Sequence, residues 1–303
     1  MEKESTMSWK FDRVAGPYKG HTGGLAWNGK AMLFSAVREE RILTFDPAAG
    51  HTDNFRRYSG RTNGLAVGAD GAMYGAQEGG RRIIQFMPDG STSPTEELID
   101  GVHHNQPTDL IIDRRGRVWF TDPYNPVAPY GPPAFPFLDH ESVLRLQRDA
   151  AGVWELVRVT RDTKSPRALA LAPDEKTLYV SVGDADKDGP CELRAYALDA
   201  NGNAGACKVM HQFGDNERGI EGLCLDRDGN IIAAGGSKQG GAGPLVYVFS
   251  PSGSIIETHA LPAGADTPMR CAFGDADLGS LYLTTGTGEL YRAKSTGRKG
   301  LNL

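Results

Sequence analysis

Long hydrophobic runs are missing from this chain of 303 residues. No apolar stretch approaches the roughly 18 residues that a membrane-spanning helix needs, so we expect no membrane partner. The N-terminal residues Met1–Trp9 are mostly polar and lack the apolar centre of a secretory signal. We therefore expect a cytoplasmic protein.

Positive charge is also scarce. The 33 Lys and Arg residues face 38 Asp and Glu residues, which gives a net charge of −5. Such a chain has no basic field to attract a phosphate backbone, so nucleic acid is not an expected partner. A small-molecule substrate is the partner that we expect, and the sequence leaves the oligomeric state open.

Cysteine is rare, and no two cysteines form a C-x-x-C pair, which argues against zinc-ribbon and thioredoxin-like sites. The four residues are Cys191, Cys207, Cys224 and Cys271. A Cys191–Cys207 disulfide is conceivable, but without an export signal we expect reduced and mostly buried thiols. A Gly-x-Ser-x-Gly elbow is absent as well, so a serine-hydrolase mechanism has no support.

Amphipathic helices are lacking too, and in their place one pattern recurs six times. A small or polar residue precedes an alternating apolar stretch, a turn that is often rich in Gly and Asp follows, and a second apolar stretch ends the segment. The segments begin at Gly24, Gly64, Asp109, Ala168, Gly222 and Cys271, which are 40 to 59 residues apart. Alternation around such a turn predicts a β-hairpin, and four strands per unit at this spacing is typical of propeller blades.

The repeat therefore predicts an all-β fold, a six-bladed β-propeller with four-stranded antiparallel blades. Because one blade cannot bury its own faces, the ring is expected to fold as a single domain. We place this domain at residues 16–303, after an N-terminal extension of residues 1–15.

A proline-rich segment interrupts the third unit. Six prolines among the fourteen residues Pro123–Pro136 exclude a central strand. A long stiff loop in a compact domain commonly serves as a lid or binding loop, and its aromatic residues favour a lid over an inert insertion. We predict that residues 123–137 form a lid over the channel mouth, on the same side as Asp109.

Several motifs along the chain look familiar when they are taken in order. They are Thr62–Val67, Asn105–Leu110 with Trp119–Tyr124, Asp174–Ser181, Gly222–Asn230, and Cys271–Gly274 with Leu281–Thr284. Together they resemble the gluconolactonase family, also called the regucalcin or senescence-marker-protein family, over about residues 16 to 294. The resemblance implies a six-bladed propeller with a divalent metal at the top of its channel, where sugar lactones and related esters are hydrolysed.

The sequence departs from this family at the implied metal ligands. The family's Glu of blade one, Asn of blade four and Asp of blade five are replaced by Gly23, Arg167 and Glu221, while the Asn of blade three reads Thr108 beside a retained Asp109. A permanent guanidinium charge repels a cation, so we expect no metal cofactor. If a metal were bound, Glu221 and Asp109 would hold it.

Six equivalent positions just before the first strand of each unit are expected to surround the channel axis. They are Gly23, Asn63, Thr108, Arg167, Glu221 and Arg270. Arg167, Glu221 and Arg270 form either a salt-bridged plug or an anion site, because guanidiniums bind carboxylates and stabilise oxyanions. We expect substrate to be bound by Arg167, Arg270, Asn63, Thr108 and, from the lid, Tyr124.

The candidate catalytic residues are carboxylates and histidines, since a His near a carboxylate is a suitable general base near neutral pH. They are Glu221, Asp109, His104 and His140. The resemblance implies a lactonase-type hydrolase, and with these residues we expect it to open a lactone or related cyclic ester of a carboxylate-bearing small molecule without the usual metal. A metal-independent lyase, isomerase or cyclase that uses Glu221 as acid/base, or a non-catalytic binding propeller, remains open.

Overall fold

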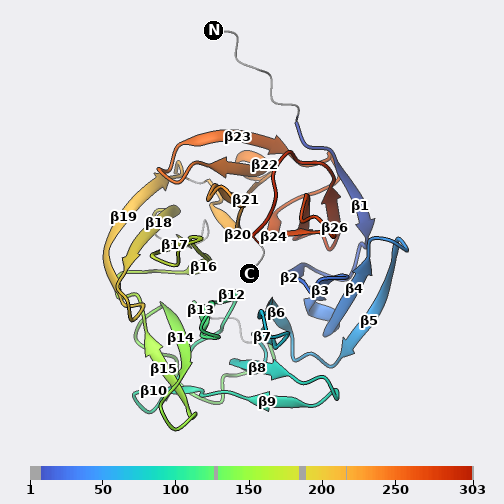
Figure 1. Ribbon diagram of the computed structural model, residues 1–303. Coiled ribbons are helices and arrows are strands. Elements are labelled where there is room, and N and C mark those ends of the chain that lie inside the picture. Colours follow the sequence, from blue (N-terminus) through green and yellow to red (C-terminus); the bar gives the residue numbers. More distant parts are fainter. Residues whose placement is uncertain (1–7, 126–128, 184–188, 216, 302–303) are drawn as a thin grey trace.

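The computed structural model describes residues 8–125, 129–183, 189–215 and 217–301. These residues form six four-stranded antiparallel sheets arranged in a ring, as Figure 1 shows, which confirms the predicted six-bladed propeller. A single 3-10 turn, η1 (Val37–Glu39), is the only helical element of the described part of the chain. None of the described residues forms a helix long and apolar enough to span a membrane.

Each blade is built from strands that follow one another in the chain, except in blade six. Blade one consists of β2 (Thr22–Trp27), β3 (Met32–Ala36), β4 (Arg41–Asp46) and β5 (His51–Arg57). Blade two consists of β6 (Thr62–Val67), β7 (Met73–Gln77), β8 (Arg82–Phe86) and β9 (Thr92–Pro94). A short hairpin of β10 (Leu98–Ile99) and β11 (Val102–His103) precedes blade three, which consists of β12 (Leu110–Ile112), β13 (Val118–Asp122), β14 (Ser142–Arg148) and β15 (Trp154–Arg158).

The second half of the ring continues in the same way. Blade four consists of β16 (Pro166–Leu171), β17 (Thr177–Val182), β18 (Glu192–Leu198) and β19 (Ala204–Gln212). Blade five consists of β20 (Ile220–Leu225), β21 (Ile231–Ser237), β22 (Gly240–Phe249) and β23 (Ile255–Ala260). Blade six combines β24 (Pro268–Gly274), β25 (Ser280–Thr285) and β26 (Leu290–Ala293) with β1 (Phe11–Ala15) from the other end of the chain.

This pairing of the chain ends corrects the predicted N-terminal extension of residues 1–15. Strand β1 is the outermost strand of blade six and pairs with β26, so the ring begins at least five residues earlier than the sequence indicated. Trp9, just before β1, stacks on His259 of blade five at 3.9 Å and donates its indole N–H to the carbonyl of Thr296 at 2.9 Å. The repeat could not reveal this strand, because the unit that it completes lies at the opposite end of the sequence.

The core fills the spaces between neighbouring blades. Between blades three and four, Trp119 and Val180 are fully buried and pack in one cluster with Tyr196. Both faces of a blade are covered in this way, which is why the whole of β3 is buried. No disulfide joins any two of the four cysteines, and Cys191 and Cys271 are buried as predicted.

Candidate active site

The innermost strands pack against one another around the axis. A Cβ atom at Gly23 would lie 2.7 Å from Oδ1 of Asn63, and one at Gly222 would lie 2.6 Å from the Cα atom of Arg270. Two residues that lead into these strands, Arg61 and Ser165, have the left-handed φ angles 54° and 44°. Such conformations cost non-glycine residues on the order of 1–3 kcal/mol and cluster at functional sites. The ring of strand starts is therefore both crowded and strained.

Arg270 spans the channel from blade six to the opposite blade, blade three. Its Nε lies 3.3 Å from Oδ1 of Asp109, and its Nη2 donates to the carbonyl of Thr108 at 3.2 Å. Its Nη1 donates to the carbonyls of Glu221 and Met269. The sequence-predicted residues Thr108, Asp109 and Arg270 thus meet, but the guanidinium of Arg270 pairs with the carboxylate of Asp109.

Glu221 is surrounded by positive charge. Its Oε1 lies 2.7 Å from Nη2 of Arg218, a residue that the sequence analysis missed although it precedes Glu221 by only three positions. Burial opposes the ionisation of Glu221, but the charges of Arg167, Arg218 and Arg270 outweigh it and hold the pKa of this carboxyl below its usual range. Burial raises the pKa of Asp109 even though Arg270 is close to it.

A second group of polar residues lies at the start of blades one and two. Glu78, which directly follows β7, pairs with Nη2 of Arg61 at 3.0 Å and accepts a hydrogen bond from Nδ2 of Asn63 at 3.5 Å. Burial raises the pKa of Glu78 in spite of the charge of Arg61. Burial and the charge of Arg270 lower the pKa of His21 to about 4, so its imidazole is neutral at pH 7. Of these residues only Asn63 was predicted as part of the site.

The sequence held one signal for Glu78. The second strand of a blade runs antiparallel to the first, so the residue after it returns to the end of the channel where the first strand begins. Acidic and basic residues after the second strands were therefore candidates, and Glu78 is one of them.

The described part of the proline-rich loop lies across blade two. The hydroxyl of Tyr130 donates to Oε1 of Glu40 in blade one at 2.5 Å, and Nη1 of Arg61 donates to the carbonyl of Pro129 at 3.3 Å. Tyr130 therefore lies beside the Arg61–Glu78 pair, as a lid would. Residues 126–128 of the predicted lid are outside the described residues.

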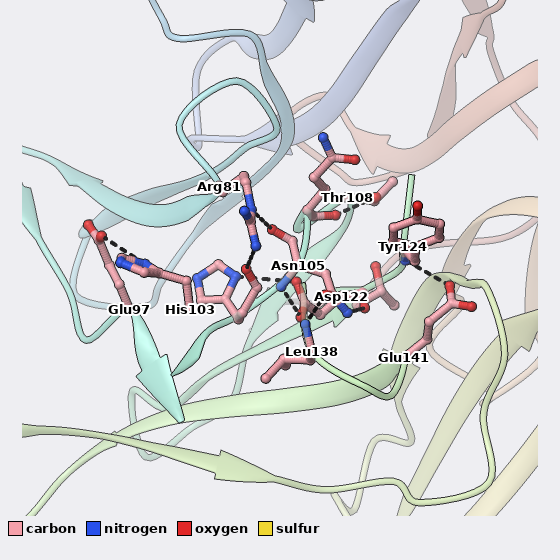
Figure 2. Close-up of polar contacts among 12 residues, drawn as sticks. Arg81, Glu97, His103, Asn105, Thr108, Asp122, Tyr124, Leu138 and Glu141 are labelled. Atoms are coloured by element: carbon pink, nitrogen blue, oxygen red, sulfur yellow. Dashed lines mark hydrogen bonds and ion pairs between the residues drawn. The ribbon is translucent and has the colours of Figure 1, made fainter. Parts of the chain in front are cut away.

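Arg81 holds the other end of this loop, and Figure 2 shows its side chain beside Asn105 of the segment before blade three. Its Nη1 and Nη2 donate to the carbonyls of Phe135 and Pro136 at 2.7 and 3.1 Å, and its guanidinium lies 4.3 Å from the ring centre of Phe137. The same guanidinium donates to the carbonyls of His104 at 2.9 Å and Asn105 at 3.0 Å. The guanidinium of Arg81 thus joins the proline-rich loop to the segment before blade three.

The predicted residues His104, His140 and Tyr124 lie at the base of this loop. Nδ1 of His104 is 3.2 Å from Oδ1 of Asp122, and both side chains are fully buried. The side chain of Asn105 donates to the carbonyl of His140 at 2.8 Å. The backbone N–H of Tyr124 donates to Oε2 of Glu141 at 2.7 Å (Figure 2), and its ring lies 4.8 Å from that of Phe137. These contacts make the three residues part of the loop's support, whereas Arg270, Asp109 and Thr108 meet on the axis.

The donors at the implied metal positions do not fit a divalent cation. Gly23 offers no ligand and Arg167 offers a positive charge. Glu221 is an anion, but Arg218 already neutralises it at 2.7 Å. Within the described ranges, His, Cys, Asp and Glu residues form no group of three or more suited to a metal ion.

A cavity lies on the far side of Arg270. It has a volume of about 780 Å³ and is lined by Asp109 and Arg270, by the inner strands beyond Leu25 and Leu65, and by the C-terminal residues 299–301. The six strand starts do not line it, apart from Arg270 itself. The guanidinium of Arg270 therefore separates this chamber from the polar mouth of the channel.

Known proteins resemble this chain over nearly its full length. A gluconolactonase from Zymomonas mobilis is 28% identical over 277 residues, which cover 83% of this chain and 72% of that protein. A 6-deoxy-6-sulfogluconolactonase from Pseudomonas putida is 25% identical over 267 residues, 85% of this chain and 82% of that protein. A solved gluconolactonase structure from Xanthomonas campestris superimposes with a TM-score of 0.78 at 27% identity, covering 94% of this chain and 89% of that one.

The family model described as SMP-30/Gluconolactonase/LRE-like region matches residues 22–287. This match spans all six innermost strands, from β2 to β24, and thus the whole ring of strand starts at the channel mouth. It confirms the resemblance that the sequence motifs indicated. The chain belongs to the SMP-30/gluconolactonase/LRE-like family.

Proposed function

We propose that the protein is a lactonase-type hydrolase that opens a lactone carrying an anionic group, such as a carboxylate, at the mouth of its channel and without a divalent metal. Family membership and the similarity to two gluconolactonases and a sulfogluconolactonase support lactone hydrolysis. The observation that supports an anionic substrate and a metal-free reaction is the cluster of guanidiniums at the channel mouth.

The guanidiniums of the mouth favour an anion. Arg167, Arg218 and Arg270 surround Glu221, and Arg270 also contacts Asp109. Clustered guanidiniums attract a substrate carboxylate and bind it through paired N–H groups. The name of the Pseudomonas putida relative specifies a sulfo group on its lactone, which agrees with an anionic substrate for this chain.

The same cations suit the reaction. When water attacks the carbonyl carbon of a lactone, negative charge develops on the carbonyl oxygen, and a fixed guanidinium stabilises it without reorganising. Arg167 occupies the ring position where the family's blade-four ligand stands, so we assign this role to Arg167. Glu221 and Asp109, both predicted as catalytic, then hold the guanidiniums in place, because the low pKa of Glu221 keeps it ionised.

A lactone panel tests this proposal. We expect hydrolysis of lactones that bear a carboxylate, weaker hydrolysis of neutral lactones of the same ring size, and no loss of rate after exhaustive chelation. Loss of activity with a chelator, restored by one metal ion, would contradict the metal-free part. A product whose mass does not include one added water molecule would contradict hydrolysis and favour the lyase alternative.

A further inference from the structure

We infer that Glu78 transfers the proton in this reaction, taking it from the attacking water and returning it to the ring oxygen of the lactone. The inference rests on the proposed lactonase function and adds a catalytic residue that neither the repeat pattern nor the resemblance indicated. It follows from the position of Glu78, from the unpaired polar atoms around it, and from the charge on the other carboxyls of the mouth.

Glu78 lies beside one of the six channel positions. Its side chain is 16% exposed, and its carboxylate contacts Arg61 at 3.0 Å and the amide of Asn63 at 3.5 Å. Asn63 stands next to Gly23, because a Cβ atom at Gly23 would lie 2.7 Å from Oδ1 of Asn63. Gly23, where the sequence resemblance implies a Glu, is therefore packed closely against Asn63 and adjoins the Asn63–Glu78 pair.

Two buried polar atoms near Gly23, besides Nε of Arg61, have no hydrogen-bond partner among the described residues. They are Oδ1 of Asn63 and Nε2 of His21. A buried acceptor or ring nitrogen without a partner costs free energy unless water or a ligand satisfies it. His21 carries no charge at pH 7. These atoms can therefore orient a water molecule within reach of a neighbouring base.

Glu221 is a poor base by comparison, because Arg167, Arg218 and Arg270 hold it as an anion. Burial raises the pKa of Asp109 as it does that of Glu78, so the choice of Glu78 rests on its contact with Asn63, whose Oδ1 has no hydrogen-bond partner among the described residues. The burial of Glu78 raises its pKa even though Arg61 and Arg38 face it. Opposite shifts in the pKa values of two nearby carboxyls are typical of active sites in which one carboxyl transfers a proton and the other stays charged.

The other described groups around Glu78 are Tyr130, His21, Arg38 and Arg61. Burial raises the pKa of Tyr130, whose hydroxyl is bonded to Glu40, so this phenol stays protonated. His21 has a pKa of about 4. Arg38 and Arg61 remain cations. A pH dependence that disappears with the Glu78 carboxyl therefore belongs to Glu78.

The step is balanced. The oxygen of water bonds to the carbonyl carbon while one of its protons passes to a carboxylate oxygen of Glu78. The bond between the carbonyl carbon and the ring oxygen then breaks, and the ring oxygen takes that proton as it leaves as a hydroxyl group. One water is consumed per lactone, Glu78 ends ionised as it began, and the new carboxylic acid ionises into solvent.

The test is the pH profile of kcat/KM for a carboxylate-bearing lactone that the wild-type protein opens. The wild type should lose rate as the pH falls through the raised pKa of Glu78. In Glu78→Gln the acidic limb of the profile should disappear. Its kcat should fall by about 10²- to 10⁴-fold, the usual contribution of general acid–base catalysis, and its KM should change little. Glu155→Gln, an exposed carboxyl on β15, should match the wild type.

Two further variants are needed in case Glu78→Gln does not fold. Glu78→Ala should regain part of its rate when formate is added. Glu78→Asp keeps a carboxyl and should therefore retain the acidic limb of the pH profile at a lower kcat. A Glu78→Gln protein that retains the wild-type limb would overturn the inference while leaving the proposed function intact. A wild-type protein that opens no lactone would overturn both.

Discussion

Arg167 carries a permanent positive charge at a position where the sequence resemblance implies a neutral Asn. If its guanidinium stabilises the oxyanion, Arg167→Ala should reduce kcat by about 10²- to 10³-fold, or about 2.7–4 kcal/mol, as the loss of one oxyanion donor does. Steady-state kinetics on a carboxylate-bearing lactone measure this change. Arg148→Ala, at an exposed position at the end of β14, is the matched control and should leave the rate unchanged. A rate for Arg167→Ala within a few-fold of the wild type would contradict the assignment.

Glu78 also permits a prediction about stability. Its pKa is raised in the folded protein, so its contribution to stability is fully present below the unfolded pKa and is lost as the pH rises through the folded pKa. The ionised carboxylate thus costs free energy at neutral pH. Glu78→Gln should therefore unfold at the same or a higher temperature than the wild type at pH 7, and the difference should shrink on acidification. A lower Tm for the variant at pH 7 would indicate that the Arg61–Glu78 pair is chiefly structural.

The residues of the site differ in how far the sequence could predict them. Arg270, Asp109 and Thr108 were identifiable because the register of the repeat fixes which residue begins each inner strand. Arg61 and Arg218 were not, because they lie in loops whose direction toward the axis depends on packing between blades. Glu78 was a candidate only through its position after the second strand of blade two. His104 and His140 were selected for their nearness in sequence to blade three, and nearness along a chain does not determine which way a buried ring points.

At the scale of elements, the proline-rich loop was recognisable from composition alone. Prolines exclude a central strand, and the structure does bring the described part of this loop over blade two, beside Arg61. Its fastening by Arg81 was not foreseeable, since Arg81 precedes the loop by about 40 residues and adopts a left-handed φ of 50°. That angle depends on the turn between β7 and β8.

Arg81 should control substrate binding through this loop. Removing it deletes hydrogen bonds to Phe135 and Pro136, each contributing about 0.5–1.5 kcal/mol, so Arg81→Ala should raise KM on the order of tenfold while kcat and Tm change little. Arg82→Ala is the matched control, because Arg82, the neighbour of Arg81 in sequence, donates to Gln77 and not to the described part of the loop. Limited proteolysis should cut Arg81→Ala faster near residues 129–137. Equal KM and equal cleavage in the two variants would argue against a lid.

At the scale of the whole molecule, the sequence repeat predicted both the number of blades and the number of strands in each. A spacing of this length is typical of four-stranded blades. The closure of the ring did not follow from it. Blade six borrows β1 from the N-terminus, so the last repeat looks complete in sequence only up to β26. A ring closed by pairing its two chain ends resists opening, since every blade then has neighbours on both sides.

The N-terminal strand should therefore decide the stability of the entire ring. Deleting residues 1–15 removes β1 and Trp9, exposes the edge of β26, and uncovers the core that Phe11 and Trp9 help to fill. Truncating one buried aromatic residue costs about 3–5 kcal/mol, so Trp9→Ala alone should lower the unfolding free energy by about that amount. Deleting only residues 1–7 leaves Trp9 and β1 in place and is the matched control. Thermal unfolding followed by circular dichroism should show the control close to the full chain and the longer deletion unfolded or strongly destabilised. A longer deletion with an unchanged Tm would mean that β26 closes the ring without its partner.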